Sequence, residues 1–226
     1  MTNFFIGPFL EWVPSVVWVA VIFYAAFRYV TERGGEKPAN NFFLRFSYRQ
    51  LALAVIVFHL VYAFFSTVGQ YWVWRASAFT QSFLQFPLDS VVISPLADFF
   101  AGIFKSKLGY FLFYSWGHFW AFAFLSIAMA WVFRVYLRWL EKRNSRFFYE
   151  GEVQLGFLCA LVVGWPKIIL FIPVLFLSVL TVSLYKIFSS KESYTTLGYP
   201  FLLGVVLTAL LWDPLSSVFF LAQWNP

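Results

Sequence analysis

The chain has 226 residues, of which 62% are hydrophobic and only 12% are charged, and its mean hydropathy is +0.75. Soluble domains carry about a quarter charged residues, so this composition excludes an ordinary water-soluble protein. A net charge of +6 would suggest a nucleic-acid partner in a soluble protein. Here the Lys and Arg residues lie in short segments between apolar runs, where they act as topology signals, and we expect no nucleic-acid partner. The composition predicts an all-α integral membrane protein whose main partner is the lipid bilayer.

Two apolar runs open the chain and predict transmembrane spans at about residues 12–30 and 50–68. The first run has no basic segment before it and is interrupted early by Glu11 and Pro14. We therefore expect it to remain as a helix and not to be removed as a signal peptide. Between the two runs, residues 31–38 combine glycine, proline and charged side chains, which is typical of a loop.

The long connection that follows, residues 69–108, is of mixed polarity. Residues 86–104 within it are apolar but contain Asp89, Asp98 and two prolines. Charged residues are costly inside the hydrocarbon core. We therefore expect a re-entrant or interfacial segment at about 86–104 and no clean span.

The second half of the chain predicts four more spans. A very aromatic run at about 109–133 is followed by a charged segment. Residues 153–188 are then almost all apolar, but a single helix over this range would be about 54 Å long, which exceeds a bilayer core of about 30 Å. We expect a break at Gly164-Trp165-Pro166. The predicted spans of this half lie at about 109–133, 153–164, 168–187 and 197–212, which gives a single membrane domain of about six helices.

The distribution of Lys and Arg predicts the orientation of these spans. Basic residues are concentrated in segments 31–49, 134–152 and 186–196, and are sparse in the longer connection 69–108. Short basic loops lie on the cytoplasmic side. We therefore expect a multi-pass protein of the cell inner membrane with both termini outside.

The candidates for metal or proton chemistry are few. His59 and His118 lie within the second and third predicted spans, where each could relay a proton or bind a substrate. Neither has a carboxylate at helical spacing, and the single cysteine, Cys159, excludes a cysteine-based metal cluster. We expect no metal site and no cofactor, and the pattern leaves the roles of the two histidines open.

One constellation carries a family resemblance. The chain reads Gly151-Glu152-Val153-Gln154-Leu155, then Gly164-Trp165 after a helix length, then Pro200-Phe201-Leu202 after another. In order and spacing this resembles the C-terminal half of the type IV prepilin leader peptidases, which are membrane aspartyl proteases of the GxGD class. The resemblance implies a catalytic carboxylate at Glu152, with Asp89 as its partner, and a membrane-anchored substrate protein.

The departures from the family pattern point away from catalysis. Glutamate stands at position 152 where the family has aspartate, and an aspartyl dyad depends on accurate placement of both carboxyls. The predicted topology also puts Asp89 and Glu152 on opposite sides of the membrane. Glu152 lies in a charged segment with Glu150 and Arg146, where we expect water to solvate it. We therefore predict carboxyls more than about 10 Å apart, no intact protease chemistry, and little effect of Glu152→Gln on folding.

Three functional classes remain open at this point. The first is an active prepilin-peptidase-like protease that uses Asp89 and Glu152. The second is a lipid-modifying enzyme, because residues 146–150 (Arg-Phe-Phe-Tyr-Glu) resemble a short motif of prolipoprotein diacylglyceryl transferases, although the motifs that carry their chemistry have no counterparts here. The third is a non-catalytic membrane scaffold or transporter-like protein. The sequence leaves the oligomeric state open.

Overall fold

The computed structural model describes residues 3–34, 45–87, 106–190 and 196–218, and all regular elements in these ranges are helical. Asp89 and most of the predicted segment 86–104 lie outside the described residues. The all-α prediction is confirmed for the part of the chain that is described.

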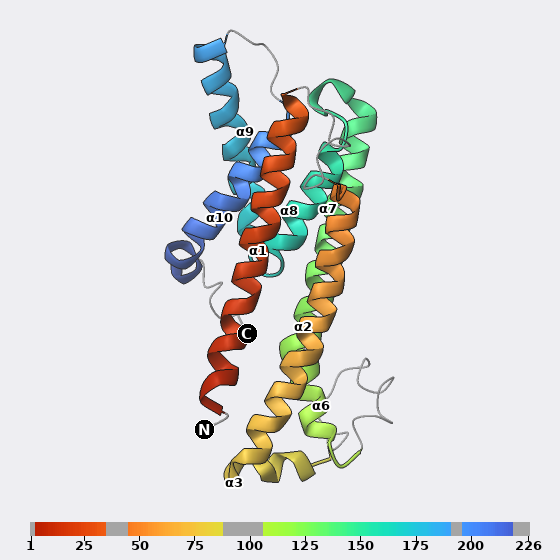
Figure 1. Cartoon of the computed structure of the whole chain (residues 1–226), viewed down its shortest axis with the longest axis vertical. Helices are drawn as coiled ribbons and strands as arrows, with labels where there is room; N and C mark the ends of the chain where they lie inside the picture. Colours follow the sequence, from red (N-terminus) through yellow and green to blue (C-terminus); the bar gives the residue numbers. More distant parts are fainter. Residues whose placement is uncertain (1–2, 35–44, 88–105, 191–195, 219–226) are drawn as a thin grey trace. The chain divides into compact units, whose positions relative to one another are not determined.

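Among the described residues, five helical segments are long and apolar enough to cross a membrane, which supports a multi-pass membrane protein by length and composition. They contain the predicted spans at 12–30, 50–68 and 109–133, and they match those at 168–187 and 197–212 closely. The helices are α1 (Asn3–Arg33), α2 (Tyr48–Ala76), α6 (Gly109–Ser115) continued by the π-helical turn η4 (Trp116–Trp120) and α7 (Ala121–Arg143), α9 (Ile168–Ser190) and α10 (Gly198–Val218) (Figure 1).

The predicted fourth span corresponds to a shorter helix, α8 (Glu152–Val163). Its 12 residues extend about 18 Å, which is less than the thickness of a hydrocarbon core. Short connecting helices complete the described elements: α3 (Ala78–Gln81), η3 (Ser82–Gln85) and η5 (Ser145–Phe147).

The described residues form two compact parts. The first contains residues 3–12, 59–87 and 106–123, and its centre is aromatic. Trp74 is buried there, with its ring centroid 5.4 Å from that of Phe111 and 5.0 Å from that of Tyr114. Trp120 donates a hydrogen bond to Thr67 at 3.1 Å. Clustered Trp and Tyr side chains of this kind are typical of membrane interfaces.

The second part contains residues 13–34, 45–58, 124–190 and 196–218, and α8 is its core. Ten of the twelve residues of α8 are buried, and the helix packs on α9 and α10. Gly156 allows α7 and α10 to approach α8, because a Cβ at this position would lie 2.6 Å from Leu137 and 2.8 Å from Phe201. A short helix surrounded by protein in this way does not need the length of a lipid-facing span.

The predicted break between residues 153 and 188 is confirmed. The first helix of this hairpin, α8, ends at Val163, and α9 begins at Ile168. Gly164 adopts a φ of +63°, a left-handed conformation that glycine tolerates best. The N–H of Trp165 donates to the buried hydroxyl of Ser126 at 2.8 Å, so the turn is tied to α7.

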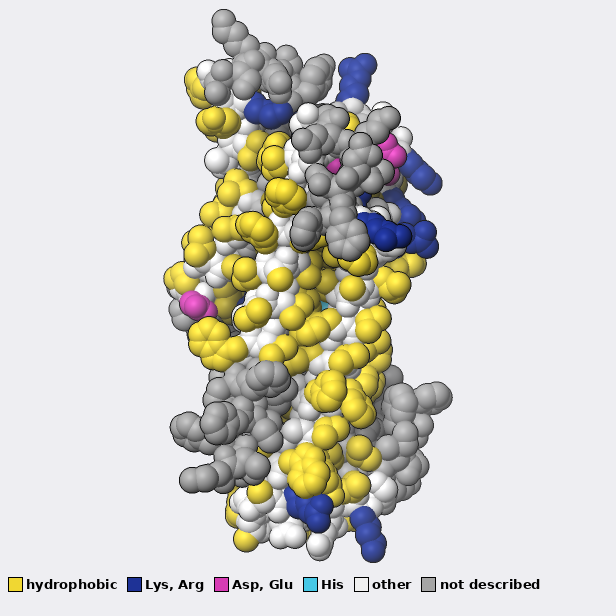
Figure 2. Space-filling model, viewed as in Figure 1, with side chains coloured by type: hydrophobic (Ala, Val, Ile, Leu, Met, Phe, Trp, Pro, Cys, Tyr) yellow, Lys and Arg dark blue, Asp and Glu magenta, His cyan; other side chains and the backbone are white. Residues whose placement is uncertain are grey.

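The outward faces of the long helices are apolar. Figure 2 shows hydrophobic side chains, drawn in yellow, over much of the described surface in that view. On α9 alone, Phe176, Leu177, Leu180 and Leu184 are exposed. A surface of this composition fits contact with lipid tails.

Candidate functional site

The site that the sequence singled out is a buried carboxylate at the first residue of α8. Glu152 follows Gly151, whose φ of +88° turns the chain into the helix. The Glu152 residue is 1% exposed. The prediction that water solvates this carboxylate is therefore wrong: the side chain contacts α1 and the residue before α10 and is enclosed by protein.

The Glu152 carboxylate accepts three hydrogen bonds. The Tyr29 hydroxyl donates to Oε1 at 2.5 Å, and the backbone N–H groups of Tyr149 and Leu197 donate to Oε2 at 3.0 and 3.1 Å. The Arg33 guanidinium lies 3.8 Å from Oε1 and supplies the compensating positive charge. A carboxylate has about four acceptor positions, so these contacts occupy most of them.

The location of the carboxylate at a helix N-terminus adds a favourable field. The N–H of Glu152 donates to the carbonyl of Tyr149 at 3.1 Å, while the N–H of Tyr149 donates back to the Glu152 side chain. These two bonds close the turn that precedes the helix, and a negative charge at this end of α8 gains about 0.3–1 kcal/mol from the helix dipole. The helix start and its acidic residue therefore stabilise each other.

Arg33 is held in an aromatic enclosure. Its guanidinium carbon lies 5.7 Å from the ring centroid of Tyr29, 5.5 Å from that of Tyr149 and 5.9 Å from that of Tyr199. It also donates to the hydroxyl of Thr196. Cation–π contacts and one ion pair thus hold the arginine that neutralises Glu152.

Tyr29 reaches the carboxylate because Gly198, the first residue of α10, leaves room for its ring. A Cβ on Gly198 would lie 2.1 Å from Cζ of Tyr29. The Tyr29 hydroxyl also lies 3.3 Å from that of Thr196, and its ring packs edge-on against Tyr199. Thr196, Gly198 and Tyr199 therefore all contact the Tyr29 side chain of α1.

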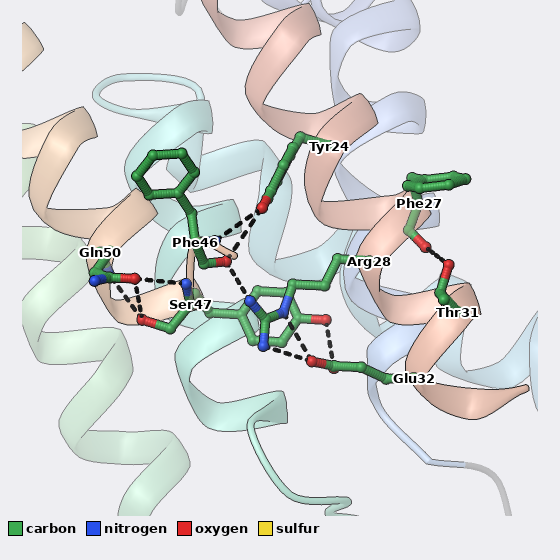
Figure 3. Close-up of polar contacts among 9 residues, drawn as sticks. Tyr24, Phe27, Arg28, Thr31, Glu32, Phe46, Ser47 and Gln50 are labelled. Atoms are coloured by element: carbon green, nitrogen blue, oxygen red, sulfur yellow. Dashed lines mark hydrogen bonds and ion pairs between the residues drawn. The ribbon is translucent and has the colours of Figure 1, made fainter. Parts of the chain in front are cut away.

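A second polar cluster joins the same stretch of α1 to the start of α2 (Figure 3). Arg28 donates to Glu32 at 2.7 Å and to the carbonyl of Phe46. The hydroxyl of Tyr48 donates to the other carboxylate oxygen of Glu32 at 3.0 Å. The Tyr48 ring also packs against Gly151, where a Cβ would lie 3.4 Å away. This cluster thus adjoins the turn that carries Glu152.

Together the two clusters gather four helix termini: the end of α1 and the starts of α2, α8 and α10. Each terminus borders one of the three basic segments 31–49, 134–152 and 186–196. The contacts therefore bring these four termini together, and the side of the membrane on which they lie stays a prediction.

The remaining predicted site residues are Asp89, His59 and His118. Asp89 lies outside the described residues, so its distance from Glu152 stays a prediction. His59 is half-buried in α2, and His118 is exposed in the π-helical turn, stacked at 4.2 Å on Tyr114. Among the described residues, no group of three or more His, Cys, Asp or Glu side chains could hold a metal ion.

Lys167, in the turn after α8, has its own environment. Its ammonium lies 5.7 Å from the ring centroid of Trp212. Asp213 of α10 supplies an opposite charge near this lysine. The lysine and the carboxylate of α10 therefore form a small polar spot at the end of α8 remote from Glu152.

Sequence reasoning missed the partners of Glu152. Tyr29, Arg33 and Leu197 are far from Glu152 in sequence, and each has an ordinary position at the end of an apolar run or in a loop. The available signal was charge balance, because a carboxylate drawn into an apolar protein needs a cation, and Arg33 stands at the end of the first span.

The arrangement suits a structural role better than proton transfer. A general base needs a free lone pair directed at water or substrate. The lone pairs of Glu152 are instead directed at three donors, and its side chain has no exposed surface. Comparisons with known protein families, with curated proteins and with solved structures give no match for this chain.

Proposed function

We propose that this chain is a polytopic inner-membrane protein, distantly similar to the prepilin leader peptidases in its C-terminal half, that acts as a non-catalytic scaffold. In this proposal the position of the family's catalytic aspartate has become a structural anchor. Glu152 ties α8 to α1 and α10 and performs no hydrolysis.

The observation that carries the proposal is that protein groups occupy most of the hydrogen-bond acceptor positions of the Glu152 carboxylate. Three hydrogen bonds and the charge of Arg33 surround it, and its side chain is inaccessible. In an aspartyl dyad, the two carboxyls share a proton and one of them activates a water molecule. A carboxylate engaged with four protein groups would have to break those contacts before it could perform that step.

The topology belongs to the same proposal. The bond from Leu197 to Glu152 supports a common side for the segments before α8 and before α10. The chain between them then enters the membrane and returns to the same side as a hairpin of α8 and α9, in which α8 is the short inner helix. With α1, α2 and α6–α7, this favours both termini outside and the three basic segments in the cytoplasm.

The test is a cleavage assay with the purified full chain in detergent and a prepilin-like peptide as substrate. We expect no cleavage by the unmodified chain, and none by Glu152→Gln or by Glu152→Asp, which restores the family's residue. Glu150→Gln, an exposed carboxylate two residues away, is the matched control. Cleavage by the unmodified chain that is lost in Glu152→Gln and kept in Glu150→Gln would overturn the proposal in favour of the protease.

A further inference from the structure

A second feature of the molecule is a cluster of arginines without acidic partners. Arg134 and Arg138 lie one helical turn apart on α7, and Arg49 is the second residue of α2. The charges of Arg138 and Arg49 act on Arg134 as like charges. Among the described residues, the ion pairs involve Arg28 and Arg33, and none involves these three.

Arg134 is the inner member of the cluster. Its guanidinium carbon lies 5.0 Å from the ring centroid of Phe157 on α8, and its Nε is buried without a hydrogen-bond partner. The side-chain carbonyl oxygen of Gln154 is also buried without a partner. Residues 154 and 157 are three apart on α8 and share a face, so an unpaired donor and an unpaired acceptor lie along one seam of α7 and α8.

Unpaired buried groups of this kind are costly, and more so close to lipid. Three positive charges together also repel each other unless an anion lies between them. Arg134 is the first residue after the predicted span 109–133, so the cluster lies at the end of that span. In Figure 2 dark blue side chains gather at the upper right, where Figure 1 draws the end of α7.

We propose that Arg49, Arg134 and Arg138 bind the phosphate of an anionic phospholipid headgroup on the cytoplasmic side of the membrane. The guanidinium groups donate to the phosphate oxygens, which supplies the acceptor that Arg134 Nε lacks. A hydroxyl of the headgroup, as in phosphatidylglycerol, supplies the donor that Gln154 lacks. The exposed apolar faces of the helices continue into the acyl-chain region, so the lipid tails need no separate pocket.

This inference takes the cytoplasmic side from the proposed function, but it uses none of the contacts of the Glu152 carboxylate. It also separates the cluster from the other basic residues of the segment. Arg143 has a comparable aromatic contact, 5.5 Å from the ring centroid of Trp139, but it is exposed and has no buried unpaired atom. Arg143→Gln therefore removes one charge and one cation–π contact without touching the cluster.

The experiment measures lipid binding to the full chain in lipid nanodiscs or mild detergent by native mass spectrometry. The probes are phosphatidylglycerol, phosphatidylcholine, soluble glycerol phosphate and inorganic phosphate. We expect phosphatidylglycerol to bind at least tenfold more tightly than phosphatidylcholine. Arg49→Gln/Arg138→Gln, which leaves the half-buried Arg134 in place, should weaken that binding about 25-fold, because each of the two basic residues contributes about fivefold. Arg143→Gln should change it less than twofold.

Two results would overturn the proposal. Equal loss of binding in Arg143→Gln and in the double variant would show only a general charge effect. Binding of inorganic or glycerol phosphate as tight as that of phosphatidylglycerol would identify a free phosphate as the ligand and not a lipid. Arg134→Gln adds a second measurement: with its folding checked by the thermal midpoint, it should reduce the preference for the anionic lipid further.

Discussion

At the scale of single residues, Glu152 illustrates how an acidic side chain is accommodated inside an apolar protein. Burying a carboxylate costs several kcal/mol unless a counter-charge and hydrogen-bond donors replace water. Here Arg33 supplies the charge, and one hydroxyl and two backbone N–H groups supply the donors. The stability of this region therefore depends on the whole set of contacts and not on one ion pair.

A series at position 152 measures that dependence. In Glu152→Gln the amide oxygen can keep both backbone N–H groups, and the Tyr29 hydroxyl can accept from the amide nitrogen, but Arg33 loses its counter-charge. We expect a loss of about 1–2 kcal/mol in the free energy of unfolding, whereas Glu152→Leu should lose about 3 kcal/mol or more, because it leaves the donors unpaired. Thermal midpoints in detergent would give this order. Unchanged midpoints in both variants would contradict the anchoring role.

The structure therefore revises the expectation that Glu152→Gln leaves folding nearly unchanged. That expectation followed from a solvated carboxylate, and the carboxylate is buried. The sequence did predict that α8 starts at Glu152 and that the helix start favours an acidic residue. It could not predict the bond to Tyr29, because the two residues are 123 positions apart and no local pattern relates them.

At the scale of helices, close approach at glycine determines how α1 and α10 pack. Gly198 faces the buried ring of Tyr29, whose hydroxyl is already fixed by Glu152. The ring cannot turn aside without breaking that hydrogen bond. The short separation between these helices is therefore a property of the glycine and the tyrosine together.

Gly198→Ala tests this packing. The added Cβ would lie 2.1 Å from Tyr29 Cζ, so we expect a loss of about 1–3 kcal/mol from overpacking. Gly117→Ala is the matched control, because a Cβ there meets nothing within 4 Å. Alanine is also the better helix former, by up to about 1 kcal/mol, so the control should be neutral or slightly stabilising. Similar midpoint shifts for the two variants would show that the close approach has no energetic consequence.

The turn between α8 and α9 offers a second test at this scale. Ser126→Ala removes the acceptor of the Trp165 N–H in a buried position, and we expect a loss of about 1–3 kcal/mol. Ser178→Ala is the control, since the buried Ser178 hydroxyl only adds a bond to the carbonyl of Val174 one helical turn before it. Thermal midpoints of the two variants should differ clearly. A larger effect of Ser178→Ala would be the contrary result.

The helices also show which features the sequence could predict. The break near Pro166 followed from length and from the Gly-Trp-Pro turn, and both are local properties. The sequence could not predict the burial of α8, because a run of apolar residues shows the same pattern whether it faces lipid or protein. Tertiary contacts such as those at Gly156 distinguish an inner helix from a lipid-facing span.

At the scale of the whole molecule, the number of crossings depends on α8. In the part of the chain that is described, five helical segments have the length and composition of spans, and the apolar helix α8 is too short to cross. If only the five long segments crossed the membrane, the segments before α8 and before α10 would lie on opposite sides. The hydrogen bond from Leu197 to Glu152 instead requires them to be adjacent. A hairpin in which α8 and α9 enter and leave the membrane on the same side is consistent with both the short length of α8 and this hydrogen bond.

Cysteine accessibility decides between these topologies. In a Cys159→Ser background, we expect Gly35→Cys, Asn144→Cys and Ser193→Cys all to resist an impermeant thiol reagent in intact cells, because the proposed topology places the three basic segments on the cytoplasmic side. Ser106→Cys, in the exposed start of the described chain before α6, should be labelled and serves as the positive control.

Each outcome of this labelling has a distinct structural meaning. Labelling at position 193 alone, with positions 35 and 144 protected, would mean that the α8–α9 unit crosses once, which the bond between Leu197 and Glu152 does not allow. Labelling at all three basic segments with protection of position 106 would reverse the orientation but keep the hairpin. Protection of all three with labelling at 106 requires α8 and α9 to enter and leave on the same side. A 12-residue helix can meet that requirement only because protein, and not lipid, surrounds it.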